Sequence, residues 1–209
     1  MSGAECVVLV HGLWTNRYVM TWLGSRLRRA GFGVASLTYP SMRNDLTRNA
    51  ARLAEFVDRV QGGAVHIVAH SLGGLVALAY LVRDRPQRVR RVVLLGSPVQ
   101  GCEVGRRIAS RGAMRPFLGA TAKLWTASEP LVADDRFEVG TIAGTVPVGL
   151  GRIFVRLDEP SDGVVRLDEA RYARARDHIE LALAHSQLLV SPAVARQTIA
   201  FLRTGRFER

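Results

Sequence analysis

The sequence predicts an α/β fold of three layers, in which helices cover both faces of a mostly parallel sheet of about six strands. Short apolar runs alternate along the chain with longer segments of helical periodicity, as is typical of parallel sheets. The first run, Cys6–Val10 (CVVLV), is apolar at every position, as expected of a strand buried on both faces. The length of 209 residues suits one domain with a sizeable core, so we expect a single domain over residues 1–209.

The first half of the chain alternates regularly between helix and strand patterns. Residues 18–30 have a helical pattern that stops at Gly31, a residue suited to the end of a helix. Residues 46–60 place their apolar side chains on one helical face, and a second, fully apolar helix begins near Leu72. The strands predicted between these helices are Val34–Tyr39, Val65–Ala69 and Val89–Leu95.

The second half of the chain is less regular. Residues 103–133 carry helical stretches interrupted by Gly112, Pro116 and Gly119, so we expect a cap-like helical insertion there rather than one long helix. Ser191 followed by Pro192 predicts the start of a helix that runs to about Arg203. The strands predicted in this half are Phe137–Ala143, Ile153–Leu157 and His178–Leu183.

The composition is that of a globular protein rather than of a membrane-spanning or disordered one. Apolar residues make up 48% of the chain, yet no apolar run approaches the roughly 20 residues that cross a bilayer. The first residues, MSGAECVVLVHG, lack the basic start of a secretory signal peptide. Cys6 and Cys102 lie far apart in the sequence and are expected to be two free thiols in a reducing compartment. We therefore expect a cytoplasmic location.

The formal net charge of +11 raises the question of an anionic partner. Lys123 is the only lysine among 29 basic residues, and the arginines are spread along the whole chain. The sequence contains no zinc-finger spacing, RNA-binding motif or basic recognition helix. We therefore expect solvated helix faces and no nucleic-acid partner.

One stretch, HIVAHSLGG at residues 66–74, joins a strand pattern to a helix pattern with a serine at the junction. In a sharp strand-to-helix turn the residues two before and two after that serine must be small, and here they are Ala69 and Gly73. Such a turn presents Ser71 at the carboxyl end of the sheet, where function collects in open α/β sheets. The pattern indicates a nucleophile elbow; the alternative is that Ser71 is an ordinary helix N-cap.

A second pattern, VVLVHGLWTN at residues 7–16, runs from a buried strand into a loop. Acyl transfer requires two backbone N–H groups that stabilise the oxyanion of the tetrahedral intermediate. We assign one to Leu72, directly after the serine, and the other to Leu13, which follows Gly12 in this loop. His11 is expected to shape the loop rather than to act in catalysis.

These motifs resemble the α/β-hydrolase fold in its lipase and esterase branch. The resemblance is carried by VVLVHG followed by VAHSLGG, and alanine at the first position of the elbow occurs in some small members. LLGSPVQG resembles the strand and loop after the nucleophile helix, SDGVV the acid turn, and AHSQLLVSP the histidine loop. The resemblance covers most of the chain. It implies a minimal form of the fold and a serine hydrolase that acts on carboxylic esters without a metal or cofactor.

The resemblance also implies the chain order serine, acid, histidine. Of the five histidines, only His178 and His185 follow the aspartates at 158, 162 and 168, which are the candidates for the acid. His178 opens a predicted strand and is expected at the far edge of the sheet, whereas His185 follows that strand on the same edge as Ser71. We therefore expect His185 to be the general base.

The acid is one of three aspartates between the later strands, Asp158, Asp162 and Asp168. Asp162 stands in the turn sequence SDGVV, and the residues alone are equally consistent with a structural Asx turn there. The resemblance to the acid turn favours Asp162 as the residue that orients His185.

The expected substrate is a small-molecule or lipid ester. Trp14, Tyr39 and the loop around Val99–Cys102, with Val99 foremost, are expected to line the acyl pocket, although aromatic residues there are equally consistent with the core. Two other hypotheses remain open. One is acyl transfer or thioester cleavage by the same triad, and the other is a non-catalytic interaction protein that keeps the fold. The oligomeric state is not predicted.

Residues 103–133 combine basic side chains with apolar and aromatic ones, which is one pattern of a membrane-surface element. An ordinary cap over the site is the expected structure, because the glycines and the proline prevent one long amphipathic helix. A weak contact with an anionic membrane surface is the alternative.

Overall fold

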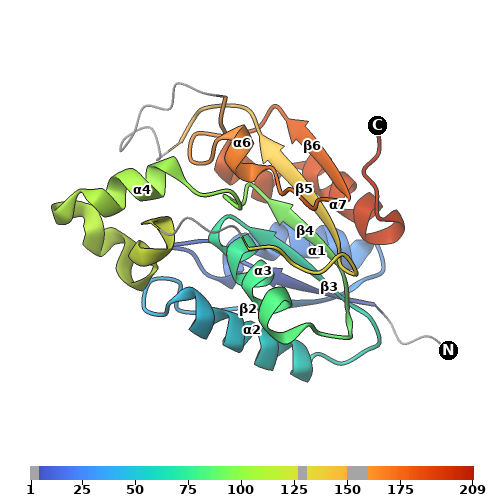
Figure 1. The fold of residues 1–209 in the computed structure, drawn as a ribbon. Helices are drawn as coiled ribbons and strands as arrows, with labels where there is room; N and C mark the ends of the chain where they lie inside the picture. The colour runs from blue at the N-terminus through green and yellow to red at the C-terminus, as the bar shows by residue number, and fades with distance from the viewer. Residues whose placement is uncertain (1–4, 127–130, 150–159) are drawn as a thin grey trace.

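The computed structural model describes residues 5–126, 131–149 and 160–209, which form one parallel sheet between two layers of helices (Figure 1). The sheet has six strands in the order β2-β1-β3-β4-β5-β6, and every neighbouring pair is parallel. The strands are β1 (Cys6–Val10), β2 (Gly33–Leu37), β3 (Val65–His70), β4 (Val89–Leu95), β5 (Glu138–Gly144) and β6 (Asp177–Leu181). The predicted three-layer fold and parallel sheet are confirmed.

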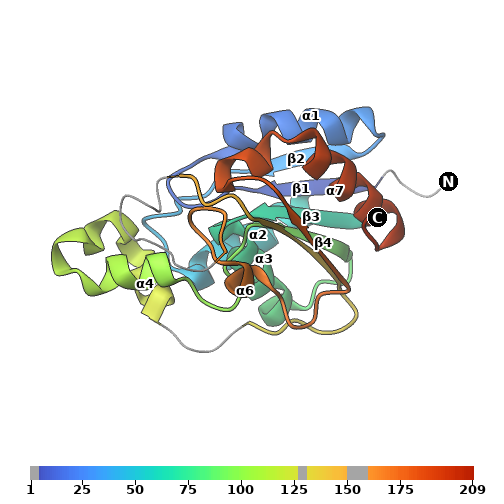
Figure 2. The ribbon, with the colours of Figure 1, turned by 90° about the horizontal axis from the view of Figure 1, so that it is seen from above.

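Two pairs of helices cover the two faces of the sheet, as the view from above shows (Figure 2). One face carries α1 (Thr21–Arg29) and α7 (Pro192–Thr204), and the other carries α2 (Leu46–Arg59) and α3 (Leu72–Asp84). Leu23 and Phe201 are fully buried in the cluster on the first face, and Leu53 and Leu78 in the cluster on the second. Because both faces of the sheet are covered, its inner strands β1, β3 and β4 are almost wholly buried and largely apolar rather than alternating.

Two helical segments, α4 (Glu103–Ser110) and the 3-10 segment η2 (Gly112–Thr126), project beyond the carboxyl ends of the strands (Figure 1). We call these residues, 103–126, the cap. Gly119 has a φ of +56°, so the helical backbone is interrupted there. The remaining short segments are η1 (Arg17–Met20), α6 (Leu167–Ala170) and η3 (His185–Leu189).

Two strands end earlier than the sequence predicts. β2 stops at Leu37 because Tyr39 turns into the core, where its hydroxyl donates to the carbonyl oxygen of His11 at 2.7 Å. β6 stops at Leu181, where the chain turns back on itself through a bond from the Leu183 N–H to the Leu181 carbonyl. The predicted strand Ile153–Leu157 lies outside the described residues.

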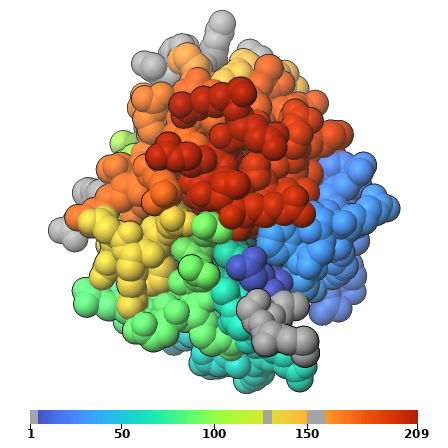
Figure 3. Space-filling view, turned by 90° about the vertical axis from the view of Figure 1, so that its right-hand side faces the viewer, coloured from blue at the N-terminus to red at the C-terminus, as the bar shows by residue number. Residues whose placement is uncertain are grey.

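The end of the sheet opposite the cap holds the C-terminal segment. Figure 3 faces this end and shows the C-terminal residues, in red, at the centre of its surface. The N–H of Phe207 donates to one carboxylate oxygen of Asp177, and the Arg209 guanidinium donates to the other, each at 2.8 Å. These bonds fasten the C-terminal residues to the start of β6.

The strand order decides which loops meet at the cap end. The chain passes from β1 outward to β2 and then returns to β3, on the other side of β1. Val10 and Ala69 are register partners near the ends of β1 and β3, so the loops that follow these two strands leave the sheet side by side. Such a switch point is where open α/β sheets bind their ligands.

Candidate active site

Ser71 occupies a strained turn between β3 and α3. Its φ is +53° and its ψ is −126°, a conformation that costs a residue with a side chain on the order of 1–3 kcal/mol. Gly73 permits the tight turn, because a Cβ there would lie 2.5 Å from the carbonyl oxygens of both Val10 and His11. The turn therefore has the geometry of a nucleophile elbow. The Ser71 side chain makes no capping bond to α3, which argues against an ordinary N-cap.

The loop after β1 lies against the elbow. A Cβ on Gly12 would be 3.0 Å from the Cβ of Ser71, and Leu13 lines the same cavity as that serine. Leu72 is the first residue of α3, where backbone N–H groups have no acceptor within the helix and the helix dipole favours negative charge. The two residues assigned to the oxyanion hole thus follow neighbouring strands, Leu13 in the loop after β1 and Leu72 at the start of α3 after β3.

His11 shapes this loop from within. Its ring is completely buried and stacks on Tyr39 with the ring centroids 4.3 Å apart. The Nδ1 atom lies 2.9 Å from the Gly12 carbonyl oxygen, and Nε2 lies 3.4 Å from the Tyr39 N–H. Burial lowers the pKa of His11, so the ring is held neutral. These contacts match the structural role that the sequence predicts for His11.

Trp14 links the same loop to the cap. Its φ is +60°, and its indole N–H donates to the carbonyl oxygen of Phe117 at 2.6 Å. A second tether joins the cap to the loop after β2, where the Ala120 N–H donates to the Met42 carbonyl oxygen at 2.8 Å.

Asp162 and His185 form a hydrogen-bonded pair. His185 Nδ1 lies 2.7 Å from Asp162 Oδ2, and the Asp162 side chain is almost completely buried. The other carboxylate oxygen accepts the N–H groups of Val164 and Val165 at 3.0 and 2.8 Å. The His185 N–H also donates to the Asp162 carbonyl oxygen at 2.9 Å. Asp162 therefore makes the turn and holds the histidine at once, with one carboxylate oxygen for each.

Two of the other candidates for acid and base, Asp168 and His178, lie away from the cavity. Asp168 forms an ion pair with Arg166 at 2.6 Å, and its side chain is mostly exposed. Asp158 lies outside the described residues. His178 is near the start of β6, with Nδ1 2.6 Å from Thr141 Oγ1, so it faces the neighbouring strand rather than the site.

Gly96, which directly follows β4, contributes to the site although its role was not predicted from the sequence. Its φ is +53°, and a Cβ there would lie 3.0 Å from Asp162 Oδ2 and 3.1 Å from His185 Nδ1. The Asp162–His185 pair therefore rests on a position that has no room for a side chain. A glycine immediately after the apolar run of β4 is the sequence signal that could have revealed it.

A cavity of about 350 Å³ opens between these loops and the cap. Ser71, His185, Leu13 and Trp14 line it from the loop side. Apolar side chains line it from the cap side, among them Ile108, Leu118 and Trp125.

Two residues expected in this pocket lie in the core instead. Tyr39 is buried against His11, as described above, and Val99 is 2% exposed within the apolar cluster under α3. Cys102, at the end of the predicted Val99–Cys102 loop, does line the cavity, and burial raises the pKa of its thiol to about 12. Cys6 and Cys102 are both free and buried, as predicted.

The short helix α6, which follows the turn at Asp162, is hydrogen-bonded to the start of the cap. The Glu103 N–H, at the first residue of α4, donates to the buried Glu169 carboxylate at 2.5 Å, and the Gln100 N–H donates to the Glu169 carbonyl oxygen at 3.0 Å. Burial raises the pKa of Glu169. Within the described ranges, no group of three or more metal-ligating side chains converges on a common point.

The family model described as the alpha/beta hydrolase family matches residues 7–203. This chain belongs to that family. A curated relative, 2-hydroxy-6-oxo-2,4-heptadienoate hydrolase of Pseudomonas putida, is 31% identical over 157 residues, which cover 68% of this chain and 56% of the relative. The chain therefore spans little more than half the length of that relative.

Solved structures share the fold at lower identity. The mature lipase of Bacillus licheniformis is 18% identical, with a TM-score of 0.76 over 95% of this chain and 91% of that one. A metagenomic carboxyl esterase is 17% identical, with a TM-score of 0.67 over 88% of this chain and 65% of that one. A phospholipase from Legionella pneumophila is 16% identical, with a TM-score of 0.65 over 98% of this chain and 57% of that one. Among the described residues, no helix is both long and apolar enough to cross a membrane.

Proposed function

We propose that the protein is a serine hydrolase that cleaves carboxylic esters through an acyl-enzyme on Ser71. The observation that carries this proposal is the meeting of two separate features in one cavity. Ser71, in its strained turn, and His185, which is hydrogen-bonded to the buried Asp162, both line this cavity. A buried carboxylate on the Nδ1 side of a histidine leaves Nε2 free to act as a base toward a serine.

In the proposed reaction, Ser71 Oγ attacks the acyl carbon while His185 removes the hydroxyl proton. The developing oxyanion accepts hydrogen bonds from the backbone N–H groups of Leu13 and Leu72. His185 then protonates the leaving alcohol, and Asp162 keeps its ring in the required tautomer and stabilises the imidazolium. Water activated by His185 releases the acid and regenerates Ser71.

The cavity supports an ester with an apolar acyl part. Its wall on the cap side is formed by aliphatic and aromatic side chains, so acyl binding there is driven by burial of apolar surface. A volume of about 350 Å³ is at the small end of the range for ligand pockets, roughly 300–1,000 Å³. Small-molecule esters and lipids with short acyl chains therefore fit better than bulky ones.

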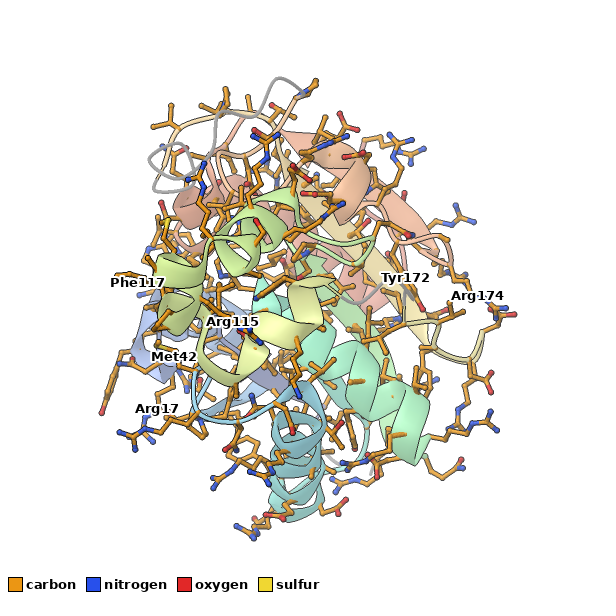
Figure 4. The ribbon with its side chains drawn as sticks, turned by 60° about the vertical axis from the view of Figure 1, so that its left-hand side comes forward. Arg17, Met42, Arg115, Phe117, Tyr172 and Arg174 are labelled. Carbon is orange, nitrogen blue, oxygen red and sulfur yellow. The ribbon has the colours of Figure 1, made fainter. Side chains whose placement is uncertain are left out.

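The surroundings of the site suggest a weak contact with anionic membrane surfaces as part of this function. Phe117 is 55% exposed and lies two residues after the exposed Arg115. Tyr18 is 68% exposed and follows the exposed Arg17 directly. Phe117, Arg115 and Arg17 lie on the same side of the molecule in Figure 4, at the end that carries the cap. Exposed aromatic and basic side chains together favour an interfacial position. The two free, buried thiols fit a reducing compartment such as the cytoplasm.

A fluorophosphonate probe tests the proposal directly, because it reacts with activated serines. We expect covalent labelling that peptide mass spectrometry assigns to Ser71. A companion screen of p-nitrophenyl esters of graded acyl length should show turnover that declines for long chains. A protein whose Ser71 stays unlabelled, and which hydrolyses none of the esters, would be better explained as a non-catalytic interaction protein.

Competition assays on the same protein distinguish ester hydrolysis from acyl transfer to an alcohol and from thioester cleavage. Addition of a primary alcohol to the ester assay should divert little of the acyl group if water is the natural acceptor. A thioester offered beside the matched oxygen ester should have the lower kcat/KM. Preferential formation of the new ester, or a strong preference for the thioester, would reassign the reaction while keeping the triad.

A further inference from the structure

His70 stands directly before Ser71, and the reaction outlined above gives it no task. It is the last residue of β3, its side chain is 4% exposed, and it lines the same cavity as Ser71 and His185. A buried position at the end of an apolar strand is normally filled by an aliphatic residue. A polar ring there carries a desolvation cost that its contacts must offset.

One ring nitrogen of His70 reaches the loop of the catalytic base. Nε2 lies 3.2 Å from the main-chain carbonyl oxygen of His185, and the two rings are 4.6 Å apart at a tilt of 47°. A carbonyl oxygen only accepts hydrogen bonds, so Nε2 must carry the proton and Nδ1 is the bare nitrogen.

The other ring nitrogen faces the oxyanion loop. Nδ1 of His70 is buried, without a hydrogen-bond partner in the described part of the chain, and a Cβ built on Gly12 would lie 3.3 Å from it. The imidazole therefore fills the space between the Gly12 loop and the His185 loop. A proton on Nδ1 would have no acceptor, which reinforces the Nε2–H tautomer.

The bond from His70 connects two units that are otherwise held separately. His185 is tied to Asp162 through both its ring and its main-chain N–H, so base and acid move together. Ser71 is tied to the sheet by a bond from its N–H to the Leu95 carbonyl oxygen. Among the described residues, the His70 contact is the direct hydrogen bond between the elbow and the histidine loop.

The charge state of His70 suits this connection. Burial lowers its pKa well below the usual value, and the neighbouring rings of His185 and His11 lower it further. A neutral ring places no positive charge beside the imidazolium that forms on His185 during the proposed reaction.

We propose that His70 is a positioning residue, which donates from Nε2 to the His185 carbonyl and so holds the catalytic base in register with Ser71. This inference rests on the proposed function. His70 touches no reacting atom in this scheme and acts through the backbone of His185.

A pair of matched variants tests the donor rather than the bulk of the ring. His70→Gln can place an amide N–H near the Nε2 position, whereas His70→Met has a similar shape and no donor. We expect His70→Met to lower kcat by between about 10-fold and about 100-fold, with little change in KM, because small misplacements of a catalytic group cost this much. His70→Gln should stay within about threefold of the parent protein, since one hydrogen bond is retained. Equal losses in both variants, or none in either, would overturn the proposal.

A second measurement needs no substrate, so it tests the positioning role of His70 independently of the proposed ester hydrolysis. Nitrogen-15 NMR of the histidine rings reports the tautomer of His70 in the folded protein. We expect a neutral ring protonated on Nε2 at neutral pH. A ring protonated on Nδ1, or charged at neutral pH, contradicts the positioning bond whatever the enzyme assays show. Absence of ester turnover and of Ser71 labelling would instead reject the proposed function while leaving the tautomer result intact.

Discussion

The loops at the carboxyl ends of the strands and the cap above them line the same cavity, but they are anchored differently. The loops carry Ser71, Asp162 and His185, and each is fixed within one or two residues of a strand or by several hydrogen bonds. The cap is held by apolar packing, with Ile108, Leu118 and Trp125 buried in the cluster on the α3 side of the sheet. A small set of hydrogen bonds adds to this packing, among them the Trp14–Phe117, Ala120–Met42 and Glu103–Glu169 bonds. The groups assigned to the chemistry thus rest on the sheet through directional hydrogen bonds, whereas the opposite wall of the cavity is held mainly by non-directional apolar contacts.

This difference matches two requirements of an enzyme, exact placement of the reacting groups and a surface that binds the substrate. A reacting group must be held within a fraction of an ångström, which buried strands and satisfied backbone bonds provide. A wall that binds an acyl group needs apolar surface more than exact geometry, and a segment held mainly by apolar packing supplies that surface. Changes in the loops should therefore act on kcat by orders of magnitude, and changes in the cap should act modestly on kcat/KM.

The largest expected effect follows from Ser71→Ala. Removal of the nucleophile should abolish the acyl-enzyme and leave at most the roughly 10³–10⁴-fold rate over water that binding and the oxyanion hole provide in serine proteases. Steady-state kinetics on a p-nitrophenyl ester measures the loss, and circular dichroism checks that the fold is kept. A folded Ser71→Ala protein with activity close to that of the parent would contradict the proposed reaction.

Next in size is the effect of Asp162→Asn, which keeps the shape of the acid but removes its charge. By analogy with serine proteases, kcat should fall by about 10⁴-fold, since the amide no longer favours the correct histidine tautomer. Asp168→Asn is the matched control, because that carboxylate is exposed and pairs with Arg166 rather than with a histidine. A larger loss in the Asp168 variant than in the Asp162 variant would show that the acid is misassigned.

A smaller effect should come from Trp14→Phe, which keeps an aromatic ring but removes the donor to the Phe117 carbonyl. A hydrogen bond of this kind contributes about 0.5–1.5 kcal/mol, so kcat/KM should fall by roughly 2- to 10-fold. Limited proteolysis should cut the cap faster in this variant. Trp22→Phe, on α1 at the other face of the sheet, serves as control and should change neither measurement. An unchanged cap and an unchanged kcat/KM in Trp14→Phe would show that this tether does not position the cap.

The smallest effect concerns the proposed membrane contact of the cap. Sedimentation with anionic liposomes at low salt should retain some protein, and higher salt should release it, because each basic residue near such a surface adds about 1 kcal/mol. A combined Phe117→Ser and Arg115→Gln variant should bind less. Arg174→Gln, an exposed residue labelled apart from the cap in Figure 4, should bind like the parent. Binding that is lost equally in both variants, or absent at low salt, would leave the cap without a membrane role.

The sequence predicted those features whose geometry depends on consecutive residues: the buried strands, the turn at Ser71 and the ends of helices. The apolar runs identified the buried strands, because a strand covered on both faces has no polar side. The turn at Ser71 was also readable, since a strained turn against β1 demands small neighbours at Ala69 and Gly73 wherever it occurs. Helix boundaries followed from caps such as Gly31, which has a φ of +94°.

Contacts between distant segments were decided only by the tertiary structure. The sequence alone left three aspartates open, and the packing of the loops after β5 and β6 brings Asp162 onto His185. Tyr39 and Val99 were expected in the pocket but lie in the core. No role was predicted for His70 or Gly96, although His70 contacts the His185 carbonyl oxygen and Gly96 lies against the His185 ring. A residue's own neighbours fix its backbone conformation, whereas its partners across the sheet depend on how several elements pack at once, and no short stretch of sequence records that arrangement.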